Sequence, residues 1–182
     1  MRVIDHPESF MSGTRVLLLT SRHKDGVEKE RVVLRVSHSE EYFRRELRDL
    51  ISIMRQTERI YATAGARDLA KASRLLKERQ LANDYDADPM AFYRVLHSRW
   101  AACLMDTKAQ ADKVWLFDCD TSGDADDARA EIAMHYDRET PPYSYKSKSG
   151  EHIIVSPFDK SRLSDGVRGL LQENAIMLWV VS

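Results

Sequence analysis

The stretch Lys113-Val-Trp-Leu-Phe-Asp-Cys-Asp-Thr-Ser-Gly123 decides how the rest of the chain is interpreted. Its first residues favour a β-strand, and they lead into Asp118 and Asp120, a Thr-Ser-Gly turn and a helical pattern at 125–136. Because alternate side chains of a strand share a face, the two carboxylates point the same way, a little under ~7 Å apart. Carboxylates so close repel each other unless a cation lies between them, and a hard divalent cation suits oxygen ligands. The stretch therefore predicts a strand that ends at a metal site.

The acidic residues that follow, Asp124, Asp126 and Asp127, have a different explanation. Acidic side chains in a first helical turn are favoured by the helix dipole and by N–H groups without a partner in the helix. We therefore interpret these three residues as part of a helix start rather than as metal ligands. Cys119 alternates with the strand aspartates, so we expect a buried, inert thiol on the packed side of the sheet.

Length and composition limit the class of protein. The 182 residues suit one domain that spans residues 1–182, and the 31% charged and 43% apolar residues are typical of a globular chain. A net charge of −1 gives no global electrostatic case for nucleic-acid binding, so any such surface must be local. Cys103 and Cys119 alone predict neither a disulfide framework nor a thiolate zinc cage. Because no apolar run approaches ~18 residues and no signal-peptide core begins the chain, we expect a cytoplasmic protein without a membrane span.

Hydrophobic periodicity predicts the remaining elements. Upstream we expect strands at 15–22 and 31–36 around a Lys24-Asp-Gly26 turn, a helix at 40–56, a strand at 59–64, a basic helix capped by Asp68, and a helix from Phe92 to Leu104. Downstream we expect a hairpin of 143–148 and 151–156, a helix at 164–172 and an apolar strand at 175–181. This order predicts an α+β fold, a mixed β-sheet with helices mainly on one face, related to the RNA-recognition and ferredoxin-like folds. The other face should be partly open to a ligand.

A second group of polar residues, Lys146, Lys148, Ser149, Gly150 and His152, lies within seven positions. Glycine lets a backbone approach a ligand closely, and the N–H groups of a turn, together with lysine, can receive phosphate oxygens. A histidine on the following strand can donate a hydrogen bond to the same phosphate or carry a proton. The alternative interpretation is a hairpin turn with solvated lysines and an incidental histidine.

Taken together, the two segments resemble the catalytic core of the archaeo-eukaryotic primase superfamily, which includes primase-polymerases and many plasmid and phage replication proteins. The first motif of this family is an apolar strand that ends in Asp-x-Asp, which Trp115-Leu-Phe-Asp-Cys-Asp120 matches. The second is a small residue, often with glycine, shortly before a histidine on an apolar strand, which the segment Ser149 to Val155 matches. The resemblance covers chiefly residues 113–181.

The resemblance implies an RNA-recognition-like palm and a primase-type nucleotidyltransferase in DNA replication. It implies Mg²⁺ or Mn²⁺ as cofactor, a nucleoside triphosphate as substrate, and single-stranded DNA or RNA as template. Asp118 and Asp120 would hold the metal, and His152 with Ser149 would hold the phosphates of the incoming nucleotide.

The chain departs from this family at the third motif, which places another acidic residue on a late strand. The apolar strand at 175–181 contains no acidic residue; Asp159 and Asp165 are the nearest candidates, and Asn174 stands just before the strand. Two metals that need three carboxylates are then short of one ligand. Catalysis could therefore be lost while nucleotide binding remains.

Three functions stay open from the sequence. The first is a minimal primase-polymerase-like nucleotidyltransferase, and the second is a non-catalytic module of the same fold that binds a nucleotide, a nucleic acid or a protein. The third interprets Asp118-Cys-Asp120-Thr121 as the phosphatase pattern Asp-x-Asp-x-Thr, although haloacid-dehalogenase-like enzymes carry this pattern on their first strand and here it comes late in the chain. Arg67, at the end of the third expected strand, is a candidate phosphate contact, with solvated surface as the alternative.

Overall fold

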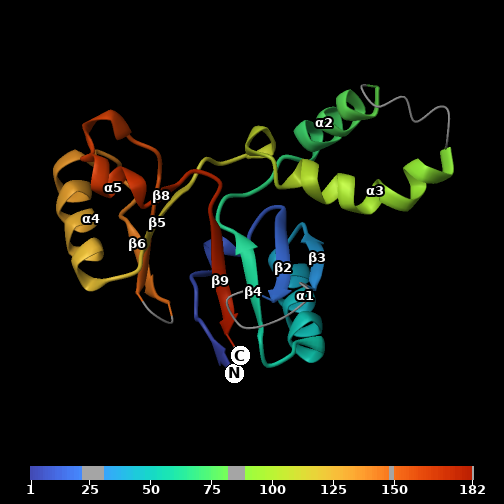
Figure 1. Cartoon of the computed structure of the whole chain (residues 1–182), viewed down its shortest axis with the longest axis horizontal. Coiled ribbons are helices and arrows are strands. Elements are labelled where there is room, and N and C mark those ends of the chain that lie inside the picture. The colour runs from blue at the N-terminus through green and yellow to red at the C-terminus, as the bar shows by residue number, and fades with distance from the viewer. Residues whose placement is uncertain (22–30, 82–88, 148–149, 182) are drawn as a thin grey trace. The chain divides into compact units, whose positions relative to one another are not determined.

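The computed structural model describes residues 1–21, 31–81, 89–147 and 150–181, so the expected turn at Lys24-Asp-Gly26 lies outside the described residues. The chain divides into two compact units (Figure 1). The first unit is Met1–Asp112 with Met177–Ser182, and the second unit is Lys113–Ile176. Length alone predicted one domain, whereas the contacts group the residues into two. Among the described helices, none has the length and apolar composition needed to cross a membrane.

The first unit is built on a five-stranded sheet with the strand order β1-β9-β4-β2-β3. Its strands are β1 (Arg2–Val3), β2 (Arg15–Ser21), β3 (Val32–Ser37), β4 (Glu58–Thr63) and β9 (Ile176–Val181). Its helices are α1 (Glu40–Ile53), α2 (Leu69–Leu81) and α3 (Pro89–Leu104), with short 3₁₀ turns η1 (Glu8–Phe10) and η4 (Thr107–Ala109).

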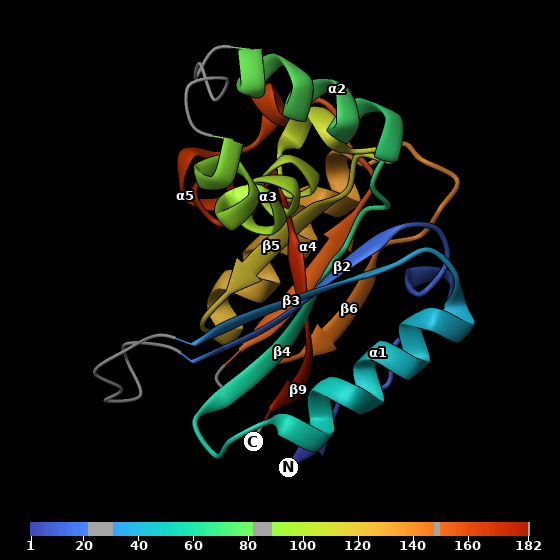
Figure 2. The same ribbon diagram turned by 90° about the vertical axis from the view of Figure 1, so that its right-hand side faces the viewer.

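Apolar side chains at helical and strand spacing form the core of the first unit. Helix α1 packs against β2 and β3 (Figure 2), and its buried Phe43 also meets Trp179 of β9, with 4.6 Å between the ring centroids. Helices α2 and α3 pack against each other and enclose a cluster with Val16 of β2. This part of the chain follows the expected order of strands and helices.

The second unit carries the aspartate strand and has a four-stranded antiparallel sheet of order β6-β7-β5-β8. Its elements are β5 (Trp115–Cys119), α4 (Ser122–His135), β6 (Tyr143–Lys146), β7 (Glu151–Val155), a 3₁₀ turn η5 (Lys160–Arg162), α5 (Asp165–Gly169) and β8 (Leu171–Gln172). In chain order, its strands and α-helices run β-α-β-β-α-β, which is the order of the ferredoxin-like motif. The aspartate strand β5 is central, between β7 and β8.

Alternation along β5 and β7 places one set of apolar residues on the face that the helices cover, whereas the buried Leu116 and Ile154 share the opposite face with Asp118 and His152. Trp115, Phe117 and Cys119 point to one face of β5 and are buried in a single cluster. That cluster also contains Ile132 of α4 and Val167 of α5. Both helices of the second unit therefore cover one face of its sheet, as the sequence predicted, and the side chains of Asp118 and His152 belong to the other face.

The structure confirms the α+β class but distributes the strands over two sheets instead of one. The apolar segment at 175–181 forms β9 and pairs with β1 rather than with the aspartate strand. The helix expected at 164–172 ends at Gly169, because the carbonyl of Leu170 accepts a hydrogen bond from the backbone N–H of Asp118 (3.0 Å) and the chain then runs along β5 as β8. The short strands β1 and β8 were not predicted.

Gly150 closes the β6–β7 hairpin against the end of β5. A Cβ atom at this position would overlap the carbonyl oxygen of Cys119 and lie 2.9 Å from its carbonyl carbon. A hydrogen bond from the N–H of Gly150 to Ser147 Oγ, 3.1 Å long, also stabilises the turn. Glycine is thus required here for backbone packing, whereas the sequence suggested that it makes room for a ligand.

We expect Gly150→Ala to lower the free energy of unfolding by at least about 2 kcal/mol, because a backbone atom cannot move away as a flexible side chain can. Urea denaturation followed by circular dichroism measures this change. Gly166→Ala is the matched control, since no heavy atom lies within 4 Å of a Cβ there, and it should leave stability equal or slightly higher. Equal stabilities for the two variants would contradict the close approach at Gly150.

Candidate functional site

The two motif strands lie side by side, and one residue of each motif meets the other. Asp118 of β5 and His152 of β7 are direct partners in the antiparallel register. Such partners project on the same face of a sheet, and here the distance from His152 Nε2 to Asp118 Oδ1 is 3.0 Å. The side chains are 42% exposed for Asp118 and 13% exposed for His152. The expected convergence of the two motifs therefore holds for this pair.

This pair belongs to a hydrogen-bonded row that crosses all four strands of the second unit. On the β6 side, Tyr145 Oη lies 2.7 Å from His152 Nδ1. On the β8 side, Gln172 Nε2 donates to Asp118 Oδ2 at 3.1 Å. We call Tyr145, His152, Asp118 and Gln172 the polar row. Each ring nitrogen of the histidine and each carboxylate oxygen of the aspartate has a partner within it.

The partners determine how hydrogen is distributed on the imidazole. An ionised carboxylate only accepts hydrogen bonds, so Nε2 of His152 must carry the hydrogen that it shares with Asp118. In a neutral ring Nδ1 is then an acceptor, and the hydroxyl of Tyr145 donates to it. The polar row thus selects the Nε2–H tautomer and leaves Nε2–H as the donor on the Asp118 side.

Asp120 follows β5 directly and is exposed to solvent. The residue after it, Thr121, caps α4: its hydroxyl accepts from the N–H of Asp124 at 3.1 Å, and the carboxylate of Asp124 accepts from the N–H of Thr121 at 3.0 Å. The interpretation of Asp124 as a helix-start residue is therefore confirmed. Helix α4 begins at Ser122, so part of the expected Thr-Ser-Gly turn is helical.

The carboxylates of this region can be compared with what a divalent cation requires. Within the described ranges, no group of three His, Cys, Asp or Glu side chains is placed to hold a metal ion. Mg²⁺ commonly uses only one or two protein carboxylates when substrate phosphates supply further oxygens. Asp118 and Asp120 are the two carboxylates at the end of β5 that would supply such ligands. Gln172 stands beside Asp118 with an amide, so it adds no third carboxylate.

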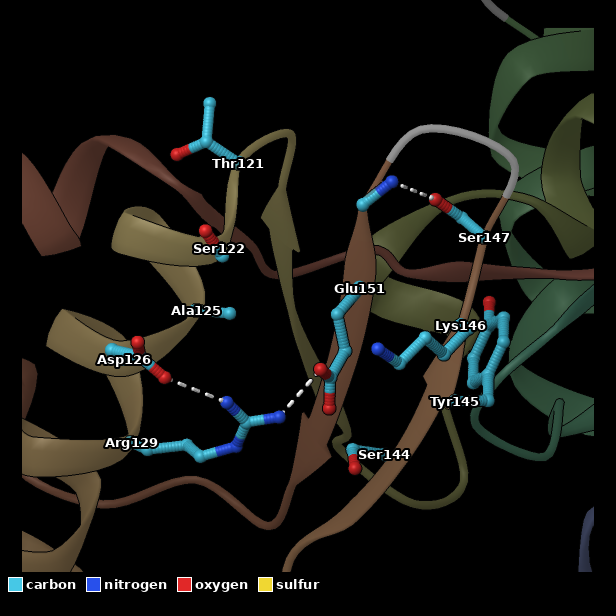
Figure 3. A pocket seen from close by; sticks show the side chains of 11 residues that line it. Thr121, Ser122, Ala125, Asp126, Arg129, Ser144, Tyr145, Lys146, Ser147 and Glu151 are labelled. Atoms are coloured by element: carbon cyan, nitrogen blue, oxygen red, sulfur yellow. Dashed lines mark hydrogen bonds and ion pairs between the residues drawn. The ribbon is translucent and has the colours of Figure 1, made fainter.

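Lys146 lies on the opposite face of the sheet from His152, which corrects the expectation that both contact the same phosphates. In the β6–β7 register Tyr145 pairs with His152 and Lys146 pairs with Glu151, and successive residues of a strand point to opposite faces. Lys146 instead lines a pocket of about 570 Å³ beside α4 (Figure 3). The pocket is also lined by Thr121, Ser122, Ala125, Asp126, Arg129, Ser144, Tyr145, Ser147, Gly150 and Glu151.

The charges in this pocket compensate one another. Arg129 forms ion pairs with Asp126 at 3.2 Å and with Glu151, and Figure 3 shows Lys146 extending toward Glu151. Burial raises the pKa of Glu151, but hydrogen bonds from Arg129 and Ser144 and the charges of Arg129 and Lys146 outweigh it, so the pKa lies below its ordinary value. Two cations facing two anions leave no excess positive charge for a triphosphate.

The other residues expected to bind nucleotide are placed as follows. Lys148 and Ser149 lie outside the described residues. Arg67 belongs to the first unit, where it is 3% exposed and its guanidinium donates to the carbonyl of Asp106 at 3.4 Å. Burial and the neighbouring charge of Arg15 lower the pKa of Arg67 to about 10, against a smaller opposing effect of Asp106. The solvated-surface interpretation of Arg67 is wrong, and its burial does not suit a phosphate contact.

Cys119 is the buried thiol that the alternation predicted, with 1% of its surface exposed. Burial raises its pKa to about 11, and the nearby carboxylates of Asp124, Asp118 and Glu151 act in the same direction. A thiol with this pKa is protonated at neutral pH and is a poor nucleophile. The chemistry of the site therefore rests on its oxygen and imidazole groups.

The sequence analysis missed two members of the polar row. Tyr145 had a usable signal, because a hairpin closed around Ser147 and Gly150 sets Tyr145 opposite His152. Gln172 had none, since its segment fits the end of a helix as well as a two-residue strand. Only the fold brings Gln172 beside Asp118.

Comparisons of this chain with protein-family models, with curated proteins and with solved structures gave no match. The residues and their geometry therefore carry the functional argument.

Proposed function

We propose that the second unit binds a nucleoside triphosphate together with one divalent cation at the end of β5, as a nucleotide-binding module of the primase-polymerase type. The observation that carries this proposal is the contact between Asp118 and His152 across β5 and β7. It brings an oxygen ligand for a cation and a hydrogen-bond donor for a phosphate to one place on the sheet.

Each residue has a distinct task in this proposal. Asp118 and Asp120 would hold Mg²⁺ or Mn²⁺, which neutralises phosphate charge when bound. His152 donates Nε2–H to a phosphate oxygen in exchange for its present acceptor, Asp118. Gln172 keeps Asp118 oriented through the bond to Oδ2. The β-α-β-β-α-β order supports the proposal, because both helices cover one face of the sheet. Asp118 and His152 of the central strands β5 and β7 then lie on the other face.

Nucleotidyl transfer onto a DNA or RNA template is the second candidate function. It is favoured by Asp118 and Asp120 at the end of a central strand, which is the arrangement that the primase resemblance implies. The amide of Gln172 argues against it, because two-metal chemistry at phosphate needs more anionic ligands than two carboxylates supply. We therefore favour nucleotide binding over nucleotidyl transfer as the function.

We expect the full chain to bind ATP in the presence of Mn²⁺ and not to extend a labelled primer on a single-stranded template. In isothermal titration calorimetry, Asp118→Asn should weaken ATP binding by at least about tenfold, because the amide is a poorer cation ligand than the carboxylate. Asp137→Asn is the charge-matched control: its side chain is 80% exposed, and its binding should equal that of the wild type. Equal affinity in all three proteins would contradict the site, whereas primer extension that Asp118→Asn abolishes would support the second candidate.

We also expect Gln172→Glu to create a better cation site by adding a carboxylate next to Asp118. Without metal the added charge should lower the melting temperature, since two like charges then face each other. Mn²⁺ should restore stability, and its affinity should exceed that of the wild type by about tenfold. Gln172→Leu removes the same hydrogen bond without adding charge and should gain no Mn²⁺ affinity. A Gln172→Glu variant that responds to Mn²⁺ no more than Gln172→Leu would show that position 172 does not face the cation site.

A further inference from the structure

The polar row contains one hydrogen bond that can be exchanged without disturbing the rest. The bond between His152 and Tyr145 is internal, because Tyr145 is 7% exposed. The bond between His152 and Asp118 is on the more open side, since the Asp118 side chain is 42% exposed. A phosphate that approaches the site would therefore meet the Nε2 side of the imidazole.

We infer that Tyr145 is a positioning residue, which keeps Nδ1 of His152 as an acceptor so that Nε2–H is the donor that moves from Asp118 to a phosphate oxygen. This inference rests on the proposed function and deepens it, because it names the atom that receives the phosphate and the residue that prepares it. Nothing in the inference requires His152 to change its protonation.

The geometry supports this role for Tyr145 in two ways. Tyr145 and His152 are direct partners across β6 and β7, so the hydroxyl is held by the backbone register rather than by a flexible chain. The two rings also meet nearly edge to face, with their centroids 5.0 Å apart and an angle of 72° between their planes, which limits rotation of the imidazole. Because Nδ1 already accepts a hydrogen bond from Tyr145, the neutral ring carries its one hydrogen at Nε2.

The change of acceptor for Nε2–H, from Asp118 to a phosphate oxygen, couples the binding of the cation to the binding of the phosphate. Asp118 accepts hydrogen bonds from His152 and from Gln172, one on each carboxylate oxygen. If Asp118 held a cation through Oδ1, it would be a weaker acceptor for the imidazole, and His152 would be able to donate Nε2–H to the phosphate of the same ligand. Because such coupling is reciprocal, the phosphate contact in turn frees Asp118 for the cation.

The test is the tautomer of His152 in the ligand-free full chain, read from long-range ¹H–¹⁵N correlation spectra of uniformly labelled protein. His152→Gln identifies the signals that belong to this ring. We expect the wild type to show a protonated Nε2 and an unprotonated Nδ1. Tyr145→Phe should keep this tautomer through Asp118, with the Nδ1 resonance shifted because its hydrogen bond is lost. The matched control is Tyr143→Phe, which removes a phenol two positions away on the same strand and face, stacked on Tyr145 with ring centroids 6.1 Å apart; it should leave the ring signals unchanged.

Affinity provides the second readout. Tyr145→Phe should weaken ATP binding in the presence of Mn²⁺ between about twofold and tenfold, as expected for one lost hydrogen bond. Tyr143→Phe should bind as the wild type does. Addition of ATP with Mn²⁺ should shift the Nε2–H signal of the wild type while Nδ1 stays unprotonated.

The outcomes separate this inference from the proposed function. A wild-type ring protonated at Nδ1, or Tyr145→Phe spectra identical to those of the wild type, would overturn the positioning role whether or not ATP binds. The expected tautomers in a protein that does not bind ATP would overturn the nucleotide site and the exchange, and would leave Tyr145 only as a structural partner of His152. The tautomer of the wild-type ring is determined without Tyr145→Phe, so the inference stays testable even if that variant does not fold.

Discussion

The antiparallel register between β5 and β7 determines which polar side chains of these two strands lie on each face of the sheet. It pairs Asp118 with His152 and Cys119 with Glu151. A shift of one residue would exchange the two faces and bury the polar pair among the apolar side chains beneath α4. The register is held by the apolar partners Phe117 and Ile153 on the covered face and by the close contact of the β6–β7 turn with the end of β5.

This register separates two kinds of polar chemistry. On the face that carries the helices, Arg129 joins Glu151 to α4, and the charges compensate within the pocket. On the other face, Asp118 is hydrogen-bonded to His152 and Gln172, and His152 to Tyr145, so groups on this face can change partners by exchanging hydrogen bonds. The difference explains why we assign ligand binding to the Asp118 face rather than to the pocket on the helix face.

Much of the fold could be predicted from the sequence, because the local signals for the main helices and strands were strong. Periodicity located the main helices and strands, and the alternation of aspartates with Cys119 placed the carboxylate and the thiol on opposite sides of β5. The two-residue strands β1 and β8 could not be predicted, since two residues carry no periodicity. The pairing of β9 with β1 joins the two ends of the chain, and no local pattern encodes such a contact.

Part of the candidate site was also predictable from local signals in the sequence. The order of the two motifs suggested that Asp118 and His152 would meet, and the structure brings them together. Lys146 was assigned to the wrong face because proximity in sequence was given more weight than strand alternation. The burial of Arg67 and the place of Gln172 beside Asp118 depend on tertiary packing, which the sequence does not display.

The most direct measurement is a crystal structure of the full chain with ATP and Mn²⁺, with anomalous scattering used to locate the metal. The account predicts one manganese peak at the end of β5, in contact with Asp118 and a phosphate oxygen, and His152 Nε2 within hydrogen-bond distance of a phosphate. Nucleotide density in the pocket lined by Lys146, with no manganese at Asp118, would contradict it.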